Sequence, residues 1–295
     1  MKRQIIDRIV GRLTFIPAFA ASLLLIVMTG VLCIRSQEIL LNQSLPTLLF
    51  SSVWQPMAGK FGFLPFIAGT VWVTFVAMAL SIPISLFSAI YLSQYAHRRI
   101  KATVQPLIDL LAGIPSIVFG LFGVLLLVPL VKDLIAPAFH ISTSGYCVLT
   151  GGLVLAIMVV PLITSIAFEV LTAVPEDMRI ASLAMGANRW ETVKYVVFRK
   201  AFPGIVAAVV LGFSRAFGET MAVLMVVGNV AKIPSSLFDP AYPIPALIAN
   251  NYGEMMSIPL YDSALMFAAL LLLVVVVIFN IIANIVLIRV KRGIS

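Results

Sequence analysis

Two ionisable side chains, Arg215 and Glu219, lie inside the apolar segment 202–230 and have the clearest potential for chemistry. In an α-helix they would lie one turn apart on the same face. At a rise of about 1.5 Å per residue, Arg215 would lie roughly 20 Å from Phe202 and roughly 25 Å from Lys232. Both estimates place it near the middle of a hydrocarbon core about 30 Å thick.

A charge at that depth costs several kcal/mol and usually faces a cavity or a partner group. We therefore interpret Arg215 and Glu219 as part of a path for a substrate. The alternative is an ion pair that only fastens neighbouring helices.

The composition sets the environment in which these residues act. The chain is 61% hydrophobic and only 11% charged, and its mean hydropathy is +1.11. Several apolar runs reach the ~20 residues that a membrane-spanning helix needs. The composition therefore excludes a soluble globular protein and predicts an all-α integral membrane protein.

The apolar runs predict six transmembrane helices in a single domain covering residues 1–295. We expect these helices at about 13–34, 63–93, 106–131, 146–173, 202–230 and 264–288. Inside the third, Pro115 removes a backbone donor among small residues, which predicts a local break that exposes backbone groups to a cavity. A kinked packing helix is an equally good interpretation of that spacing.

Basic residues predict the orientation of the chain. Of the 20 Lys and Arg residues, fifteen lie at the two ends or in alternate connections: Lys2, Arg3, Arg8, Arg12, Arg98, Arg99, Lys101, Arg179, Arg189, Lys194, Arg199, Lys200, Arg289, Lys291 and Arg292. Cytoplasmic loops of membrane proteins carry such an excess. We therefore expect both termini in the cytoplasm, and we attribute the net charge of +8 to topology and not to nucleic-acid binding.

The sequence lacks the motifs of an enzyme. It has no phosphate-binding loop, no His-Glu-x-x-His and no Gly-x-Ser-x-Gly. The two cysteines, Cys33 and Cys147, we interpret as unpaired packing residues. Because the chain has only two His besides them, we expect neither a metal site nor a cofactor. If ATP drives transport here, another chain must bind and hydrolyse it.

The longest predicted cytoplasmic connection, 174–201, contains a recognisable pattern. Ala181-Ser-Leu-Ala-Met-Gly186 resembles the coupling-helix motif of ABC importer permeases, which normally reads Glu-Ala-Ala, three residues, then Gly. Here Ile180 replaces the Glu, and Ser182 replaces the second Ala. The resemblance implies that Ala181, Ser182, Ala184 and Gly186 contact an ATPase. The alternative is an amphipathic segment that lies on the bilayer surface.

Two intramembrane runs are more specific. Ile114-Pro-Ser-Ile-Val-Phe-Gly120 and Arg215-Ala-Phe-Gly-Glu-Thr220 resemble signatures of the C-type permeases of the phosphate-specific (Pst) ABC importers, and the resemblance covers about residues 63–290. It implies a type I ABC importer permease fold in a bacterial inner (plasma) membrane. The partners that it implies are a second homologous permease of the A type, two cytoplasmic ATPases, an extracytoplasmic phosphate-binding protein and membrane lipid.

Phosphate suits the residues that this resemblance points to. The guanidinium of Arg215 stays protonated and offers a planar fork of donors to an oxyanion. Glu219 would keep the site from binding the anion too tightly, because a transported ion must also leave. The hydroxyls of Thr220 and Ser116 would supply further donors. For Ser116, a hydrogen bond to backbone groups left unpaired at a kink is a slightly better explanation.

Three other functions remain open at this point. A permease for sulfate or molybdate would share the architecture, but the Arg-x-x-Gly-Glu-Thr run argues against it. A channel or ion-driven carrier would be expected to have acidic residues in several helices or an inverted repeat. An intramembrane enzyme would need a nucleophile and a base, which the sequence lacks.

Overall fold

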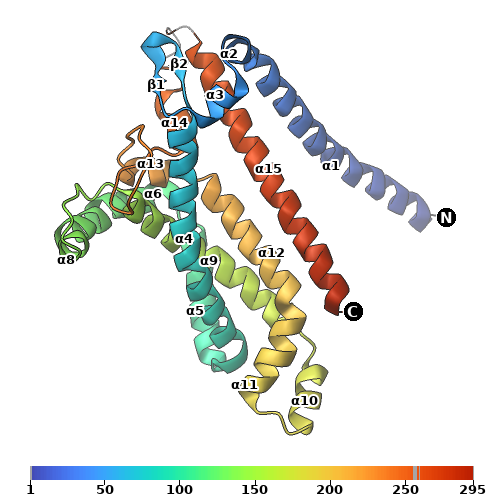
Figure 1. Cartoon of the computed structure of the whole chain (residues 1–295). Helices are drawn as coiled ribbons and strands as arrows, with labels where there is room; N and C mark the ends of the chain where they lie inside the picture. Colours follow the sequence, from blue (N-terminus) through green and yellow to red (C-terminus); the bar gives the residue numbers. More distant parts are fainter. Residues whose placement is uncertain (1, 255–257, 259, 295) are drawn as a thin grey trace.

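The computed structural model describes residues 2–254, 258 and 260–294 of the chain. Within them, six helical segments are long and apolar enough to cross a membrane (Figure 1). They are Leu13–Arg35, Leu64–Tyr95, Ser116–Ala138, Val148–Thr172, Arg189–Phe217 and Tyr261–Ile285. The prediction of an all-α membrane protein with six spans is therefore confirmed.

The centre of the fold is the contact between helices α4 (Leu64–Ile90) and α9 (Val148–Thr172). Gly152 lies directly against Val76, and the Ser85 hydroxyl donates to the Val160 carbonyl at 3.2 Å. In a membrane, small residues at such positions stabilise helix pairs because they let the backbones approach closely. The contacts advance in the same direction along both helices, so α4 and α9 run parallel.

Helix α12 (Phe198–Phe217) packs on α9 in the same way but in the opposite direction. Gly204 contacts Val170, and two turns later Gly212 contacts Val159 and Ile163. The two helices are therefore antiparallel, and Gly212 lies level with Val160, the central residue of α9.

A second core closes one end of the bundle, at the top of Figure 1. It contains the small elements α2 (Gln37–Asn42), α3 (Leu45–Phe50), β1 (Trp54–Gln55), η1 (Pro56–Ala58), β2 (Lys60–Phe61) and α14 (Ile244–Asn251), with the start of α15 (Tyr261–Ile294). Trp54 packs edge-on against Phe61, Phe63, Phe66 and Tyr261. This aromatic cluster ties the hairpin to the ends of α4 and α15.

The predicted third span, 106–131, is wrong in its position. Residues Arg98–Ala112 form a separate amphipathic helix, α5, and the span begins only after Pro115. It consists of α6 (Ser116–Phe122), the π-helical turns η3 (Gly123–Leu127) and η4 (Val131–Ile135), and the short α7 (Val128–Leu130) and α8 (Ala136–Ala138). The predicted break at Pro115 is confirmed, because a proline disfavours helix in the residue before it.

The predicted fifth span, 202–230, is also wrong at both ends. A capping box between Asn188 and Glu191 starts the helix at α11 (Arg189–Glu191), which continues through the π-helical η5 (Thr192–Val197) into α12. Gly218 ends it, and a separate helix, α13 (Met221–Val226), follows. The apolar run therefore hid a break, because hydropathy alone does not register where the backbone leaves the helix.

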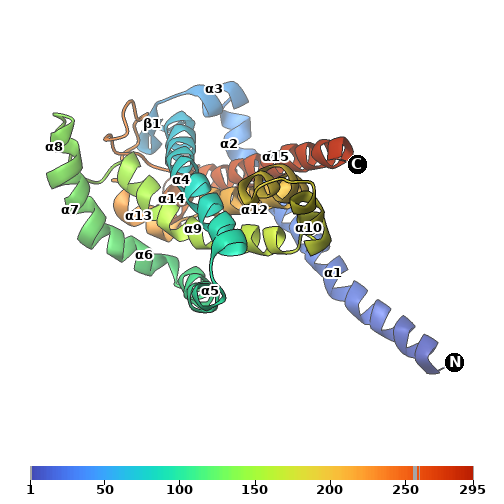
Figure 2. The same ribbon diagram turned by 90° about the horizontal axis from the view of Figure 1, so that it is seen from below.

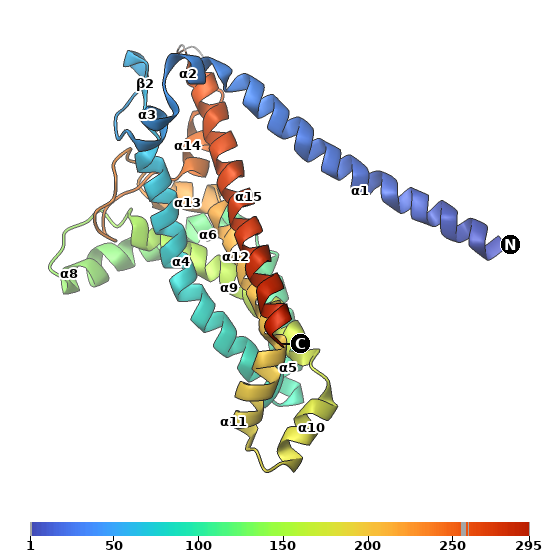
Figure 3. The ribbon, with the colours of Figure 1, turned by 45° about the vertical axis from the view of Figure 1, so that its right-hand side comes forward.

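Helix α1 (Lys2–Arg35) meets the bundle only near its C-terminal end. From there it diverges from the other helices, as Figures 2 and 3 show, and none of its residues in 13–35 has a buried side chain. At the opposite end from the aromatic cluster, α10 (Glu176–Ala184) and α11 project beyond the bundle. Both cysteines are free, as predicted.

We expect Gly152→Val to weaken the central contact between α4 and α9. A Cβ at this position would overlap Val76 and approach the Ala77 backbone nitrogen, and overpacking of this kind costs about 1–3 kcal/mol. The apparent melting temperature of the purified chain in detergent should fall. Gly30→Val is the matched control, because an added Cβ on α1 meets nothing within 4 Å. Equal melting temperatures for both variants would contradict this account of the packing.

Candidate functional site

The two helix breaks lie side by side. Gly120 of α6 packs against Ala222 and Met225 of α13, and one turn later Gly123 packs against Val226. The contacts advance in the same direction along both helices, so α6 and α13 run parallel and begin at the same level. The segments 113–115 and 218–220, which directly precede α6 and α13, are therefore neighbours within the bundle.

Arg215 lies in the last turn of α12, just before the second break. It follows Gly212 by three residues, which is about 4.5 Å along the axis, and Gly212 is level with the middle of α9. The side chain is exposed. Among the described residues it has no hydrogen-bond or ion-pair partner. Arg215 is thus an unpaired cation near mid-span on the surface of the single chain.

The predicted pairing of Arg215 with Glu219 on one helical face is wrong. Gly218 ends α12, so Glu219 lies outside the helix that carries Arg215. Instead, Glu219 Oε1 accepts a hydrogen bond from the Ala222 amide at 3.4 Å, at the start of α13. No ion pair joins the two residues, both of which the structure describes. The alternative of an Arg–Glu pair that only fastens helices is therefore not supported.

Glu219 instead lines a small cavity between α4, α9 and α12, together with Thr70, Thr74 and Leu155. The Thr70 hydroxyl donates to the Phe66 carbonyl and accepts from the Ile244 amide, which fastens α14 to α4. Thr74 is not among the site residues predicted from the sequence. The available signal was a second threonine one helical turn after Thr70 in an otherwise apolar run.

The two predicted hydroxyl residues lie at the breaks. Thr220 donates to the Gly218 carbonyl at 3.3 Å. Ser116 is the first residue of α6, and its hydroxyl has no hydrogen-bond partner among the described residues. Because α6 and α13 begin side by side, the structure brings Ser116 to the same level as Glu219 and Thr220. It records no direct contact between Ser116 and Arg215.

The predicted coupling residues lie on α10 and the turn after it. Ala181 and Ala184 are exposed, whereas Ser182 is buried and its hydroxyl lies 3.0 Å from that of Thr192. Gly186 has a φ of +88°, a conformation that glycine adopts without steric cost. Ile180, which stands where the motif has Glu, is 58% exposed. The two small residues and the turn therefore form the outer surface of a projecting helix.

Within the described part of the chain, no group of three or more His, Cys, Asp or Glu residues lies together in a way that could hold a metal ion. The arrangement around the breaks instead offers one guanidinium, one carboxylate and several hydroxyls. Such a set can bind and release a polar anion, but it contains no nucleophile next to a general base.

Comparison with known proteins identifies the architecture. Residues 81–292 match the family model described as "Binding-protein-dependent transport system inner membrane component". The chain belongs to this family. A Bacillus subtilis relative named "Probable ABC transporter permease protein YqgH" is 38% identical over 238 residues, which cover 80% of this chain and 75% of the relative. The chain is therefore a multi-pass membrane permease of the ABC importer class.

Two further relatives carry a more specific name. "Phosphate transport system permease protein PstC" of Xylella fastidiosa (strain Temecula1) is 36% identical over 257 residues, 82% of this chain and 79% of the relative. A Methanocaldococcus jannaschii protein named "Probable phosphate transport system permease protein PstC" is 33% identical, with 84% and 83% coverage. The fold also resembles that of a chain in the inward-facing MetNI methionine ABC transporter, at a TM-score of 0.55 and 17% identity, over 84% of this chain and 99% of that one.

We expect Glu219→Gln to leave the permease folded and to change transport. The glutamine amide oxygen can still accept from the Ala222 amide, and no ion pair with Arg215 is lost. Thermal unfolding in detergent should match the wild type, while the rate of substrate uptake should differ from it. Glu38→Gln, an exposed change on α2, should alter neither quantity. Loss of folded protein in the Glu219 variant would show that the carboxylate is structural.

Proposed function

We propose that this chain is the permease subunit of an ATP-driven importer of inorganic phosphate and forms part of the path of the anion. The single observation that carries the proposal is the position of Arg215. Its guanidinium lies near mid-span, unpaired and exposed on the single chain. Lipid cannot solvate a charge at that depth, so this surface must face a water-filled path or a partner subunit.

Phosphate matches what Arg215 offers. At neutral pH the anion carries between one and two negative charges and has several acceptor oxygens. A guanidinium stays protonated, presents donors in a planar fork, and gives up its water more readily than an ammonium. An attractive charge at mid-span lowers the barrier for an anion that must cross a low-dielectric region. The relatives named as phosphate permeases support phosphate over other oxyanions.

The groups around the breaks complete the proposed path. Ser116 and Thr220 lie at the same level as Glu219; the Ser116 hydroxyl would donate to an oxyanion directly, and the Thr220 hydroxyl would do so after turning from the Gly218 carbonyl. Glu219, held at the start of α13, places a negative charge close to the path, which limits how long the anion stays bound. The breaks serve this purpose because irregular backbone at membrane depth is tolerated where it lines a cavity.

The subunit composition extends the same proposal. A second homologous permease of the A type would cover the Arg215 surface and complete the path. Two cytoplasmic ATPases would bind ATP, one of them docked on α10, and a phosphate-binding protein would deliver the anion at the end with the aromatic cluster. In this arrangement both termini and α10 lie in the cytoplasm of a bacterial cell, and the remaining apolar faces contact the lipid of its inner membrane.

Arg215→Gln should reduce uptake at least about tenfold, equivalent to about 1.4 kcal/mol of barrier, while the complex still assembles. Arg215→Lys should be nearly as damaging, because a point-charge ammonium does not reproduce the planar fork. Uptake of labelled phosphate by cells that express the complete complex measures both effects. Arg35→Gln, an exposed change at the end of α1, is the control. Wild-type uptake by Arg215→Gln at normal expression would rule out its role in the path.

Ala181→Glu should detach the ATPase or uncouple hydrolysis from uptake and leave the membrane domain folded. Ala181 is exposed on α10, so the change adds bulk and charge to the proposed docking surface only. Gly186→Asp should have the same effect, with an added cost from the positive φ. Co-purification of the ATPase and phosphate-stimulated hydrolysis in vesicles measure the coupling.

The matched control for the docking surface is Ala102→Glu, an exposed alanine on α5. Its co-purification and hydrolysis should equal the wild-type values. If Ala181→Glu and Gly186→Asp also retain the ATPase and wild-type uptake, α10 is not the coupling element, and the segment 174–201 is better interpreted as lying on the bilayer surface.

A further inference from the structure

A second polar cavity lies at the α10 end of the bundle, far from Arg215. It is formed where four elements meet: η2 (Tyr91–Tyr95), which extends α4, and α5, α10 and the α11–η5 segment. Its empty volume is about 620 Å³, which includes space open to solvent. Its lining residues are Ser93, Gln94, Lys101, Arg179, Leu183, Arg189, Thr192 and Val193.

The lining carries three cations and no carboxylate. Lys101 Nζ donates to the Ser93 carbonyl at 2.9 Å, and Arg179 Nη2 donates to the Leu171 carbonyl at 2.9 Å. Arg189 donates to the Gln94 carbonyl, and its guanidinium lies over the Tyr95 ring. These contacts hold the three side chains in place. Within the described part of the chain, no acidic residue forms an ion pair with any of them.

Two buried donors in this cluster have no acceptor. Arg179 Nε and the Gln94 side-chain nitrogen Nε2 are both inaccessible to solvent and make no hydrogen bond with the described residues. A buried donor without an acceptor is costly, and such groups are rare in folded proteins. Excess positive charge and unused donors at one place are the complement of an anion with several acceptor oxygens.

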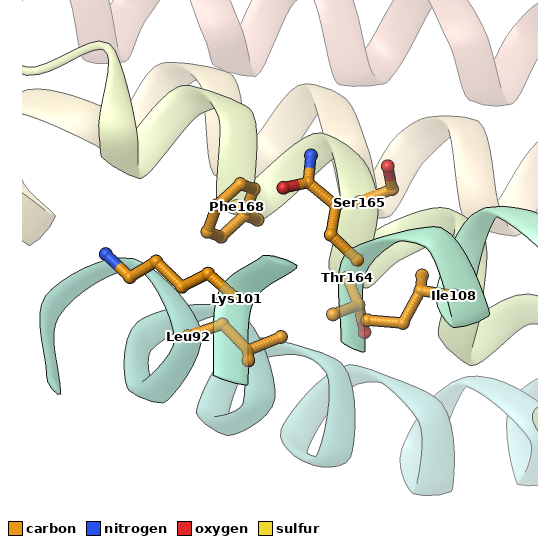
Figure 4. A pocket seen from close by; sticks show the side chains of 7 residues that line it. Leu92, Lys101, Ile108, Thr164, Ser165 and Phe168 are labelled. Carbon is orange, nitrogen blue, oxygen red and sulfur yellow. The ribbon is translucent and has the colours of Figure 1, made fainter. Parts of the chain in front are cut away.

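The cavity next to it has a different character. Figure 4 shows the aliphatic stem of Lys101 beside Leu92 and Phe168, with its nitrogen at the end that points away from Thr164 and Ser165. The stem therefore lies along an apolar wall, while the ammonium belongs to the polar cavity, where it bonds Ser93. This arrangement fixes the charge without neutralising it.

We propose that the cavity formed by Lys101, Arg179, Arg189 and Gln94 binds a small oxyanion of the phosphate class. The four donor residues come from four separate elements, η2, α5, α10 and α11, so they approach an anion from different directions, as a tetrahedral group requires. A bound anion would bridge α10 to α5 and η2 and would thereby brace the projecting helix against the spans. The site depends on its own residues and not on the role of Arg215. A free phosphate ion and a phospholipid head group share the chemistry that it recognises.

The test uses the full-length chain carrying Arg215→Gln, so that the proposed transport site does not contribute. The protein is placed in nanodiscs of phosphatidylcholine, and equilibrium dialysis measures binding of labelled inorganic phosphate. Lys101→Gln and Arg189→Gln should each weaken binding at least about tenfold, a loss of about 1.4 kcal/mol. Lys194→Gln, an exposed cation of η5 outside the cavity, should leave it within twofold.

Thermal unfolding gives the second readout and controls for folding. Each variant is compared with its own unfolding temperature without phosphate. On addition of phosphate, only the chain with the intact cavity and Lys194→Gln should be stabilised. If free phosphate does not bind, the same chains are measured in nanodiscs containing phosphatidylglycerol. If this lipid stabilises the chain with the intact cavity and not the Lys101 and Arg189 variants, the ligand of the site is a phospholipid head group. Equal stabilisation by acetate, or no anion effect that depends on Lys101 and Arg189, would overturn the proposal.

Discussion

The lipid surroundings impose the constraint on which the rest of the structure depends: a bilayer cannot hydrogen-bond to an open backbone. A spanning helix is interrupted only where other protein or a water-filled cavity covers the interruption. In this chain the breaks at 113–115 and 218–220 adjoin the spans Ser116–Ala138 and Arg189–Phe217, and the helices that follow the breaks pack together through Gly120 and Ala222. The close contact of these small residues makes each break part of the cover of the other.

The helices α4, α9 and α12 form a tightly packed frame around the breaks. Glycines on α9 and α12 let side chains of the facing helix pack directly against their backbone, and helix association in a membrane relies on such van der Waals packing and not on the exclusion of water. The frame separates two charges that are close in the sequence. Arg215 ends α12 on an exposed face, whereas Glu219 turns inward toward Thr70 and Thr74. A single continuous helix would have brought both side chains to one face and neutralised them.

The same frame connects the two ends of the molecule. One continuous helical segment, Arg189–Phe217, begins in the polar cavity beside α10 and ends at the break next to Arg215. Its 29 residues span about 43 Å at 1.5 Å per residue. Because Ser182 on α10 contacts Thr192 in this segment, a displacement of α10 has a direct mechanical route to the break. Coupling over such distances requires a contiguous physical connection of this kind.

Much of this architecture could be predicted from the sequence. The apolar runs determine that six spans exist, because spanning depends on length and hydrophobicity. Pro115 determines a break, because proline lacks the backbone donor wherever it stands. The need of Gly186 for a turn and the isolation of Arg215 in apolar sequence are equally local properties. They gave the correct class of protein, while the role of Arg215 in the path stays a prediction.

The tertiary structure decided what the apolar runs left open. Hydropathy treats 202–230 as uniform, so it did not reveal that Gly218 ends the helix and separates Glu219 from Arg215. It also did not reveal that Lys101, Arg179 and Arg189 line one cavity from three elements. In the sequence these residues indicate only which loops are cytoplasmic. Lys101 and Arg179 are 78 positions apart in the sequence, and they line the same cavity only because the helices pack together. Sequence patterns report periodicity and composition along one segment, whereas a site is set by the contacts between segments.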